Sequence, residues 1–347
     1  MPQTSQNKVG VWLPNSGSPV YSSFWPNGDR VPGIVADFNF ASSDTYASIK
    51  GGMFWNGSRT IATPAGQSEA GGVFSWGPTT DPIQDSTDEM SFGFNPMSEL
   101  WFKMRFFVPS NYTHRFILRL SVTGDLSAWQ VGDTIKGTDN IKGGILYLVS
   151  GTDVYILFPD DAGSNLTWTG TITNTTRGQS RASTRVAFHS ANNKLLAIWC
   201  NGYSDAGTSP TVVWEMLPDN LGGSTLYYHY AVDGGGTGQS GPASTSGEVP
   251  FIDISDRGKY LNFIVRLKMA TTPTGTDGVI EGWKRVDGAG SYTKLWTQTD
   301  AFIGARVGGG NFRAGYVHGW ANSGFKDLTQ IYDSRVTLAS ATIDGVV

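Results

Sequence analysis

Short runs of alternating hydrophobic and polar residues dominate this chain, and Gly, Pro, Asn and Asp separate them. Alternation with a period of two predicts β-strands, because successive side chains of a strand point to opposite faces. The turn-forming residues between the runs support the same assignment. No segment combines a sustained helical period with capping residues. The sequence therefore predicts strands at 34–40, 99–108, 114–122, 143–149, 153–158, 184–189, 194–200, 211–216, 225–231, 259–269, 278–286, 312–320 and 329–338.

Three of these segments, 99–108, 114–122 and 259–269, have one apolar face and one face with basic residues. Such strands bury one face in a core and expose the other, as in antiparallel sheets with one solvated side. If the three strands pair in one sheet, their arginines form a surface suited to carboxylates or sulfates, because guanidinium binds oxyanions bidentately. The alternative is an ordinary solvated face. The candidate ligand-binding residues are Trp101, Arg105, Arg119, Arg266 and Lys268.

Residues 311–320, NFRAGYVHGW, form the most distinctive segment. In a strand, its aromatic face comprises Phe312, Ala314, Tyr316, His318 and Trp320. This face could form the floor of a sugar-binding groove, or it could pack its large side chains in a core, since aromatic rings serve both purposes. In a binding groove, Arg313 and Trp320 are candidate ligand contacts. In an enzyme, Tyr316 and His318 are the candidate acid and base.

The composition narrows the class of protein. The chain has 347 residues, 45 of them glycine, and aromatic residues make up 12%. Aromatic strands joined by glycine-rich turns fit this balance, and one large domain over 34–347 is expected, preceded by an extended arm at 1–33. Only 16% of residues are charged, and the net charge of −4 creates no field that recruits nucleic acid or an anionic membrane.

Cysteine, metal and targeting signals are sparse. The single cysteine, Cys200, excludes an intramolecular disulfide and a multi-cysteine metal site. Asp160 and Asp161 fit either a weak calcium site or a plain turn, and we favour the turn because their spacing matches no established calcium loop. We therefore expect no metal and no cofactor. The first residues, MPQTSQNKVG, resemble no signal peptide, and no run is long enough for a membrane helix.

The C-terminal third carries a family resemblance. Asp277 to Trp283 reads DGVIEGW, Gly315 to Trp320 reads GYVHGW, and Ile331 to Val336 reads IYDSRV. Together these segments resemble the concanavalin A-like lectin/glucanase superfamily, especially its polysaccharide-lyase members. The resemblance implies an all-β fold, an antiparallel β-sandwich of the concanavalin A-like jelly-roll type. It implies little about activity, because one fold hosts many functions.

The catalytic patterns of that superfamily are largely missing. The glucanase pattern E-x-D-x-x-E, with two carboxylates on one strand, does not occur in this sequence. Alginate lyases of this superfamily have a pattern similar to Y-F-K-A-G-x-Y. This chain matches that pattern at Phe312, Ala314 and Gly315. The lyase tyrosine falls on Val317, with Tyr316 one position early, and a shift of one residue turns a side chain to the other face.

These observations favour a non-enzymatic structural or glycan-binding protein of a virus particle, such as a bacteriophage decoration, tail or adsorption component. The expected partners are other virion proteins or further copies of the chain, and an anionic polysaccharide is a further candidate. A virion or extracellular location without a signal peptide fits this hypothesis. The alternative is a polysaccharide lyase that cleaves an anionic glycan by β-elimination.

Overall fold

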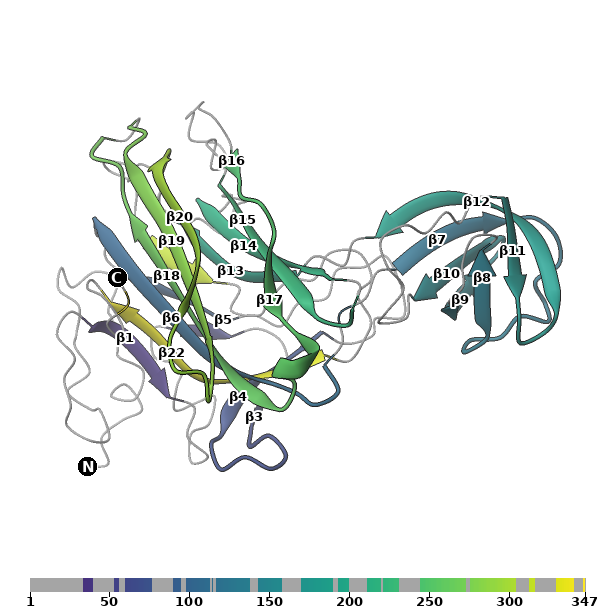
Figure 1. The fold of residues 1–347 in the computed structure, drawn as a ribbon, viewed down its shortest axis with the longest axis horizontal. Helices are drawn as coiled ribbons and strands as arrows, with labels where there is room; N and C mark the ends of the chain where they lie inside the picture. The colour runs from purple at the N-terminus through teal and green to yellow at the C-terminus, as the bar shows by residue number, and fades with distance from the viewer. Residues whose placement is uncertain are drawn as a thin grey trace.

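The computed structural model describes residues 34–39, 53–55, 60–76, 90–94, 98–112, 114, 117–137, 143–157, 170–189, 193–199, 211–219, 221–230, 244–272, 275–303, 312–315, 329–339 and 346. Within this part of the chain, the strands form two sheets and a closed barrel (Figure 1). Every strand pair is antiparallel, so the expected all-β antiparallel fold is confirmed. No helix in the described residues is long and apolar enough to cross a membrane.

Sheet A contains the strand order β20-β19-β18-β6-β22-β4-β3, and β1 also pairs with β22. Its central strands β6 and β18 carry apolar residues along one whole face, which packs in the core, and mostly polar or aromatic residues on the other. The strands are β1 (Ile34–Asn39), β3 (Thr60–Ala62), β4 (Gly71–Trp76), β6 (Glu99–Val108), β18 (Lys259–Lys268), β19 (Gly278–Val286), β20 (Thr293–Ala301) and β22 (Thr329–Ala339).

Sheet B has the order β16-β15-β14-β13-β21-β5-β2, and β17 also pairs with β15. A 3-10 turn, η2 (Ile254–Asp256), follows β17 and leads into β18 of sheet A. The strands are β2 (Met53–Trp55), β5 (Met90–Phe94), β13 (Asn193–Trp199), β14 (Val212–Pro218), β15 (Ser224–Tyr230), β16 (Ser244–Thr245), β17 (Val249–Ile252) and β21 (Phe312–Gly315).

Sheets A and B share a core that is rich in aromatic residues. Phe263 of sheet A meets Phe251 of sheet B edge-on, with ring centroids 5.2 Å apart. Trp296 of sheet A meets Tyr228 of sheet B in the same manner at 5.4 Å. These contacts join the two sheets into a sandwich, since apolar faces of sheets are stable only when packed against each other.

A glycine inside β19 makes room for this core. A Cβ atom at Gly282 would lie 2.5 Å from Cε3 of Trp296, its neighbour on β20. A larger residue would displace the indole, so the glycine lets the two strands approach with the ring between them.

The barrel consists of the six strands between β6 and β13, in the closed order β10-β7-β12-β11-β8-β9. Its interior holds a hydrophobic cluster of its own, which includes Leu118, Leu120 and Ile156. The sequence-based expectation of one jelly roll over 34–347 did not include this barrel. The strands are β7 (Ile117–Val122), β8 (Thr134–Gly137), β9 (Gly144–Ser150), β10 (Asp153–Leu157), β11 (Gly170–Asn174) and β12 (Gln179–His189).

The segment that leaves β6 toward the barrel is anchored to sheet B. The hydroxyls of Tyr112 and Ser224 lie 2.5 Å apart, and Ser224 Oγ lies 2.8 Å from Nδ1 of His114. All three residues are buried. Burial raises the pKa of Tyr112, so its hydroxyl stays protonated. His114 is therefore a structural residue at the junction between sandwich and barrel.

The expected strands agree closely with the observed ones where alternation is strong. The expected bounds 99–108 and 278–286 are those of β6 and β19. Nine strands were not expected, among them the very short β2, β3 and β16 and the largely polar β20; the others are β4, β5, β8, β11 and β17. The arm at 1–33, Cys200, Asp160 and Asp161 lie outside the described residues.

Candidate functional site

The structure brings two of the three predicted arginines onto one face and places the third elsewhere. Arg105 on β6 and Arg266 on β18 lie on neighbouring strands of sheet A. Both point to the face opposite the sandwich core, here called the outer face of sheet A, because the intervening apolar residues fill the core. Arg119 lies on β7 of the barrel. The three arginines therefore do not line one surface.

Each of these arginines already pairs with carboxylates of the protein. Arg266 contacts Glu99 at 2.9 Å and Glu281 at 2.8 Å. Arg119 contacts Asp153 at 2.5 Å. These ion pairs neutralise the guanidinium groups inside the molecule, which weakens the case for a surface that captures carboxylates or sulfates.

Trp101 and Lys268, two other residues predicted to contact a ligand, differ in their exposure to solvent. Trp101 is only 4% exposed, and its indole stacks on Trp283 with centroids 5.5 Å apart, beside Ile264 and Val346. This burial makes Trp101 a packing residue of the outer face. Lys268 is exposed at the end of β18.

The segment 311–320 is described only as β21, Phe312 to Gly315. β21 lies in sheet B, where Arg313 pairs in register with Trp199 of β13. Tyr316, His318 and Trp320 lie outside the described residues. Their predicted roles as acid, base and ligand contact stay predictions.

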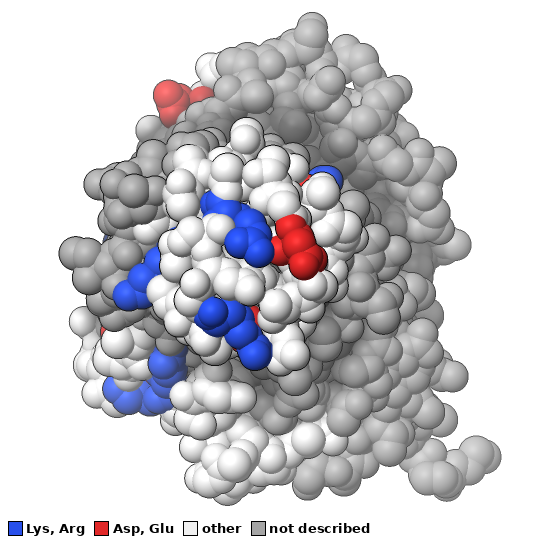
Figure 2. All heavy atoms as spheres, turned by 90° about the vertical axis from the view of Figure 1, so that its right-hand side faces the viewer, with Lys and Arg blue, Asp and Glu red and all other residues white. Residues whose placement is uncertain are grey.

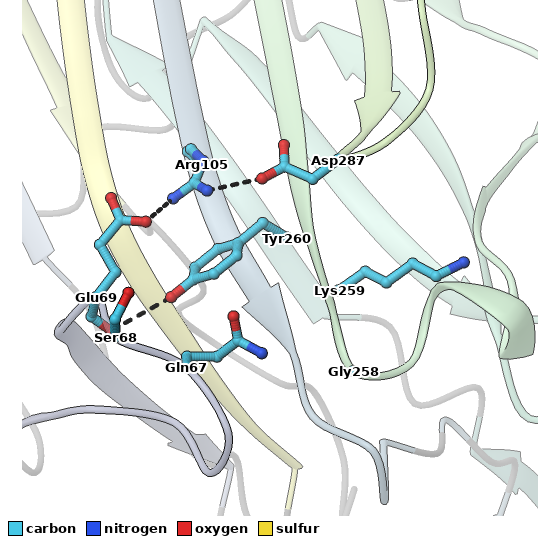
Figure 3. Close-up of a pocket in the computed structure, with 8 residues that line it drawn as sticks. All are labelled: Gln67, Ser68, Glu69, Arg105, Gly258, Lys259, Tyr260 and Asp287. Atoms are coloured by element: carbon cyan, nitrogen blue, oxygen red, sulfur yellow. Dashed lines mark hydrogen bonds and ion pairs between the residues drawn. The ribbon is translucent and has the colours of Figure 1, made fainter.

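A pocket of about 360 Å³ lies on the outer face of sheet A, around Arg105 (Figure 3). The turn between β3 and β4 forms one wall, and the start of β18 forms another. Gly66, with φ of +77°, allows the turn to fold back over the sheet, because L-residues rarely adopt this conformation. The lining residues are Gln67, Ser68, Glu69, Arg105, Gly258, Lys259, Tyr260 and Asp287.

Arg105 occupies the middle of this pocket and is held on three sides. It donates to Glu69 at 2.5 Å and to Asp287 at 2.7 Å, and its guanidinium lies 3.9 Å from the centre of the Tyr260 ring. Burial disfavours the charged guanidinium, but the hydrogen bonds to Asp287 and Glu69 outweigh it and raise the pKa of Arg105. The side chain is thus a fixed cation.

A second cluster lies on the face of sheet B that points away from the sandwich core. Tyr227 and His229 project from β15, and Glu215 projects from the neighbouring strand β14. The Tyr227 hydroxyl donates to Oε2 of Glu215, and Nε2 of His229 lies 3.4 Å from Oε1. The two rings are nearly parallel, with centroids 6.1 Å apart. We call these three residues the Glu215 cluster.

Exposure distinguishes the members of the Glu215 cluster. Glu215 is only 4% exposed, whereas the His229 side chain is 37% exposed and Tyr227 is half-buried. The carboxylate therefore lies at the base, and the two rings reach solvent. This arrangement offers apolar ring faces beside hydrogen-bonding groups, the combination that a sugar requires.

The pattern of residues along the chain does not single out the Glu215 cluster. Alternation along 225–231 already places Tyr227 and His229 on one face. The missing information was the register between β14 and β15, which sets Glu215 directly opposite Tyr227. In the part of the chain that the structure describes, no group of three His, Cys, Asp or Glu side chains is arranged to hold a metal ion.

No protein-family model matches this sequence, and no curated protein matches it either. Three solved structures illustrate what the chain is similar to. A PL-14 alginate lyase from Aplysia kurodai is 10% identical, with 89% of this chain and 99% of that chain covered and a TM-score of 0.44.

The CBM2 module of the evolved Dit of Lactobacillus casei BL23 phage J-1 is also 10% identical, with 90% and 98% of the two chains covered and a TM-score of 0.39. A legume lectin-like domain from Entamoeba histolytica is 8% identical, with 88% and 97% covered and a TM-score of 0.39. At these values, the assignment of the fold rests on the strands and sheets of this chain itself.

Proposed function

We propose that this protein is a non-enzymatic glycan-binding component of a virus particle, and that the Glu215 cluster on sheet B contacts the glycan. The observation that carries the proposal is a carboxylate at the base of two nearly parallel, partly exposed rings. This geometry matches the two needs of a sugar, an apolar surface for its C–H face and acceptors for its hydroxyls.

The positions of the three side chains are fixed by the sheet. Glu215 and Tyr227 are cross-strand partners in register, and His229 lies two residues farther along β15 on the same face. The hydrogen bond from Tyr227 holds the phenol in place before a ligand arrives. Such preorganisation favours binding, because less side-chain entropy is lost on association.

Binding is favoured over β-elimination by the state of the predicted arginines. Elimination next to a uronate carboxylate needs a cation that neutralises that carboxylate. Arg105 and Arg119 are the candidates for this role, and each pairs with at least one carboxylate of the protein.

The proposal is tested by measuring the affinity of the purified protein on a glycan array and by calorimetry with the strongest binders. We expect Tyr227→Ala to weaken binding roughly three- to tenfold, since a specific aromatic contact contributes about 0.5–1.5 kcal/mol. Tyr147→Ala, at a half-buried tyrosine of the barrel, is the matched control. Equal affinity of the Tyr227 variant and the wild type would contradict the role of the Glu215 cluster.

A lyase is the second candidate, because the Glu215 cluster also offers a phenol and an imidazole on one face. In this reaction Tyr227 and His229 would exchange protons with the sugar. Alginate, polyglucuronate and host capsule are incubated with the protein while the ultraviolet absorbance of an unsaturated product is followed. A signal that is lost in Tyr227→Phe and His229→Ala would replace the binding proposal with this one.

The virion setting is tested separately. Particles from the source of this sequence are purified through a density gradient, and their proteins are identified by mass spectrometry. Peptides of this chain in the particle fraction at a fixed ratio to the capsid protein would support the setting. Their restriction to the soluble fraction would contradict it.

A further inference from the structure

The pocket around Arg105 is distinct from the Glu215 cluster, because the two lie on outward faces of opposite sheets with the sandwich core between them. We propose that this pocket is a second binding site, and that it takes a neutral, hydroxyl-rich ligand such as an uncharged saccharide in preference to an anionic one.

The charges of the pocket are balanced. Two carboxylates, Glu69 and Asp287, face the guanidinium of Arg105, and Lys259 adds a second cation at the rim, where its side chain points away from Arg105 (Figure 3). A bound cation or a bound anion would each leave the pocket with a net charge. A neutral ligand leaves it intact while using the same groups as hydrogen-bond partners.

The acceptors of the pocket are held in place by neighbouring side chains. Asp287 accepts from Nδ2 of Asn262 at 2.8 Å as well as from Arg105. The Tyr260 hydroxyl donates to the backbone oxygen of Glu69 at 3.3 Å, which ties the β3–β4 turn to β18. A rigid carboxylate can accept two hydroxyls of a sugar at once, so fixed carboxylates suit this class of ligand.

The remaining wall supplies complementary groups. Gln67 offers an amide that both donates and accepts, and Ser68 offers a hydroxyl. The side chains of Glu69 and Asp287 are 49% and 37% exposed, so their outward lone pairs are accessible. The volume of about 360 Å³ lies at the lower end of the range for small-molecule sites, which suits one or two sugar rings.

An anionic ligand would meet the wrong partners. The NH1 and NH2 groups of Arg105 are already directed at Glu69 and Asp287. A uronate or sulfate that approached the guanidinium would come close to both carboxylates, and like charges at contact distance repel. A neutral ligand therefore suits this pocket better than the anionic polysaccharide that the sequence suggests for Arg105.

Binding is tested by saturation-transfer NMR and calorimetry on the full chain, with cellotriose, maltotriose, mannotriose and trigalacturonate as probes. We expect at least one neutral trisaccharide to bind at least about fivefold more tightly than trigalacturonate. Ser68→Trp, which fills the pocket from an exposed position, should abolish this binding. Ser150→Trp, at an exposed position on the barrel, is the matched control and should retain it.

The charge argument is tested by Glu69→Gln, which keeps the shape of the side chain and removes one negative charge. The preference should then shift toward trigalacturonate by roughly fivefold, the effect of one unit charge near contact distance in water. Asp300→Asn, an exposed residue of β20, changes the net charge equally and should leave the preference unchanged. Thermal melting of each variant verifies that it is folded.

The outcomes separate this site from the proposed function. Binding that Ser68→Trp abolishes and Tyr227→Ala preserves supports the pocket, whatever the Glu215 cluster does. The proposal is overturned if none of the neutral probes binds in a Ser68→Trp-sensitive way, if trigalacturonate is the preferred probe of the wild type, or if Glu69→Gln and Asp300→Asn have the same effect.

Discussion

The sandwich and the barrel are both built from alternating antiparallel strands, yet they bury different side chains. The sandwich core is rich in large rings such as Trp214, Phe251 and Phe263. The barrel core is almost entirely aliphatic, with Trp129 as its one aromatic member among the described residues. Two sheets about 10 Å apart leave room for rings, whereas a closed barrel of six strands has a narrow interior. The way a sheet closes therefore decides which side chains fit.

The two regions also stabilise charge differently. Sheet A uses ladders of ion pairs across its outer face, such as Glu99, Arg266, Glu281 and Lys294. The barrel surface shows basic and acidic groups side by side among uncharged ones (Figure 2). At the barrel, the carboxylate of Asp133 is buried beneath this surface and accepts several hydrogen bonds at once.

The largest effect is expected from Phe263→Ala in the sandwich core. Phe263 is fully buried, and truncation of a buried Phe costs about 3–5 kcal/mol because it leaves a cavity. Differential scanning calorimetry should show a lower melting temperature for the sandwich and an unchanged transition for the barrel. A single transition that moves as a whole would show that the two cores melt as one unit.

Leu120→Ala is the counterpart in the barrel, with an expected cost of about 2–5 kcal/mol. Because Leu120 belongs to the separate barrel cluster, the barrel transition should shift and the sandwich transition should stay. Glycan binding at the Glu215 cluster and in the Arg105 pocket should survive this variant. Loss of binding together with the barrel would mean that the barrel supports those sites.

Acidification should destabilise the barrel through Asp133. Hydrogen bonding from Arg177 above all, with further bonds from Asn174 and the Gln130 backbone, lowers the pKa of Asp133 from 3.8 to about 2. Above pH 3.8 the carboxylate is ionised in the folded and unfolded states, and its stabilising effect is complete. Below that, the unfolded state binds a proton first, so stability falls as the pH drops toward about 2.

Asp133→Asn tests whether Asp133 causes the acid sensitivity of the barrel. The variant should be less stable than the wild type at neutral pH, and its barrel transition should depend less on pH in the acidic range, as measured by circular dichroism melting. Asp300→Asn serves as the control with the same change of charge. An unaltered pH dependence in the Asp133 variant would assign the acid sensitivity to other carboxylates.

The smallest effect is expected from Arg119→Gln. Arg119 pairs with Asp153 on the barrel surface, and both side chains are partly exposed. Exposed pairs contribute about 0.2–1 kcal/mol, so the barrel transition should move by roughly one to eight degrees. Affinity for trigalacturonate should not change. A marked loss of anionic-glycan binding would support the predicted ligand-binding role of this arginine.

Local pattern was sufficient for much of the fold. Strands β6 and β19 have the expected bounds, because a short run of apolar and polar residues between turn-forming residues is a signal local to the chain. The short strands β3 and β16 and the polar strand β20 were missed, since they exist through pairing with adjacent strands rather than through their own hydrophobicity.

The candidate sites were harder to predict from the sequence than the strands were. Alternation correctly put Arg105 and Arg266 on faces opposite to apolar residues. It could not show that carboxylates 36 and 182 residues away from Arg105 would neutralise it. Nor could it show that Trp101 would be buried beneath Trp283 and Val346.

The sequence by itself determined that this chain forms antiparallel strands with two unlike faces, because the direction of a side chain follows from its position in a strand. Tertiary structure alone decided which strands meet. It closed β7 to β12 into a barrel, joined Glu215 to Tyr227 and His229, and enclosed Arg105 between Glu69 and Asp287. The physical reason is that register and long-range ion pairs depend on the packing of the whole chain, which no local period encodes.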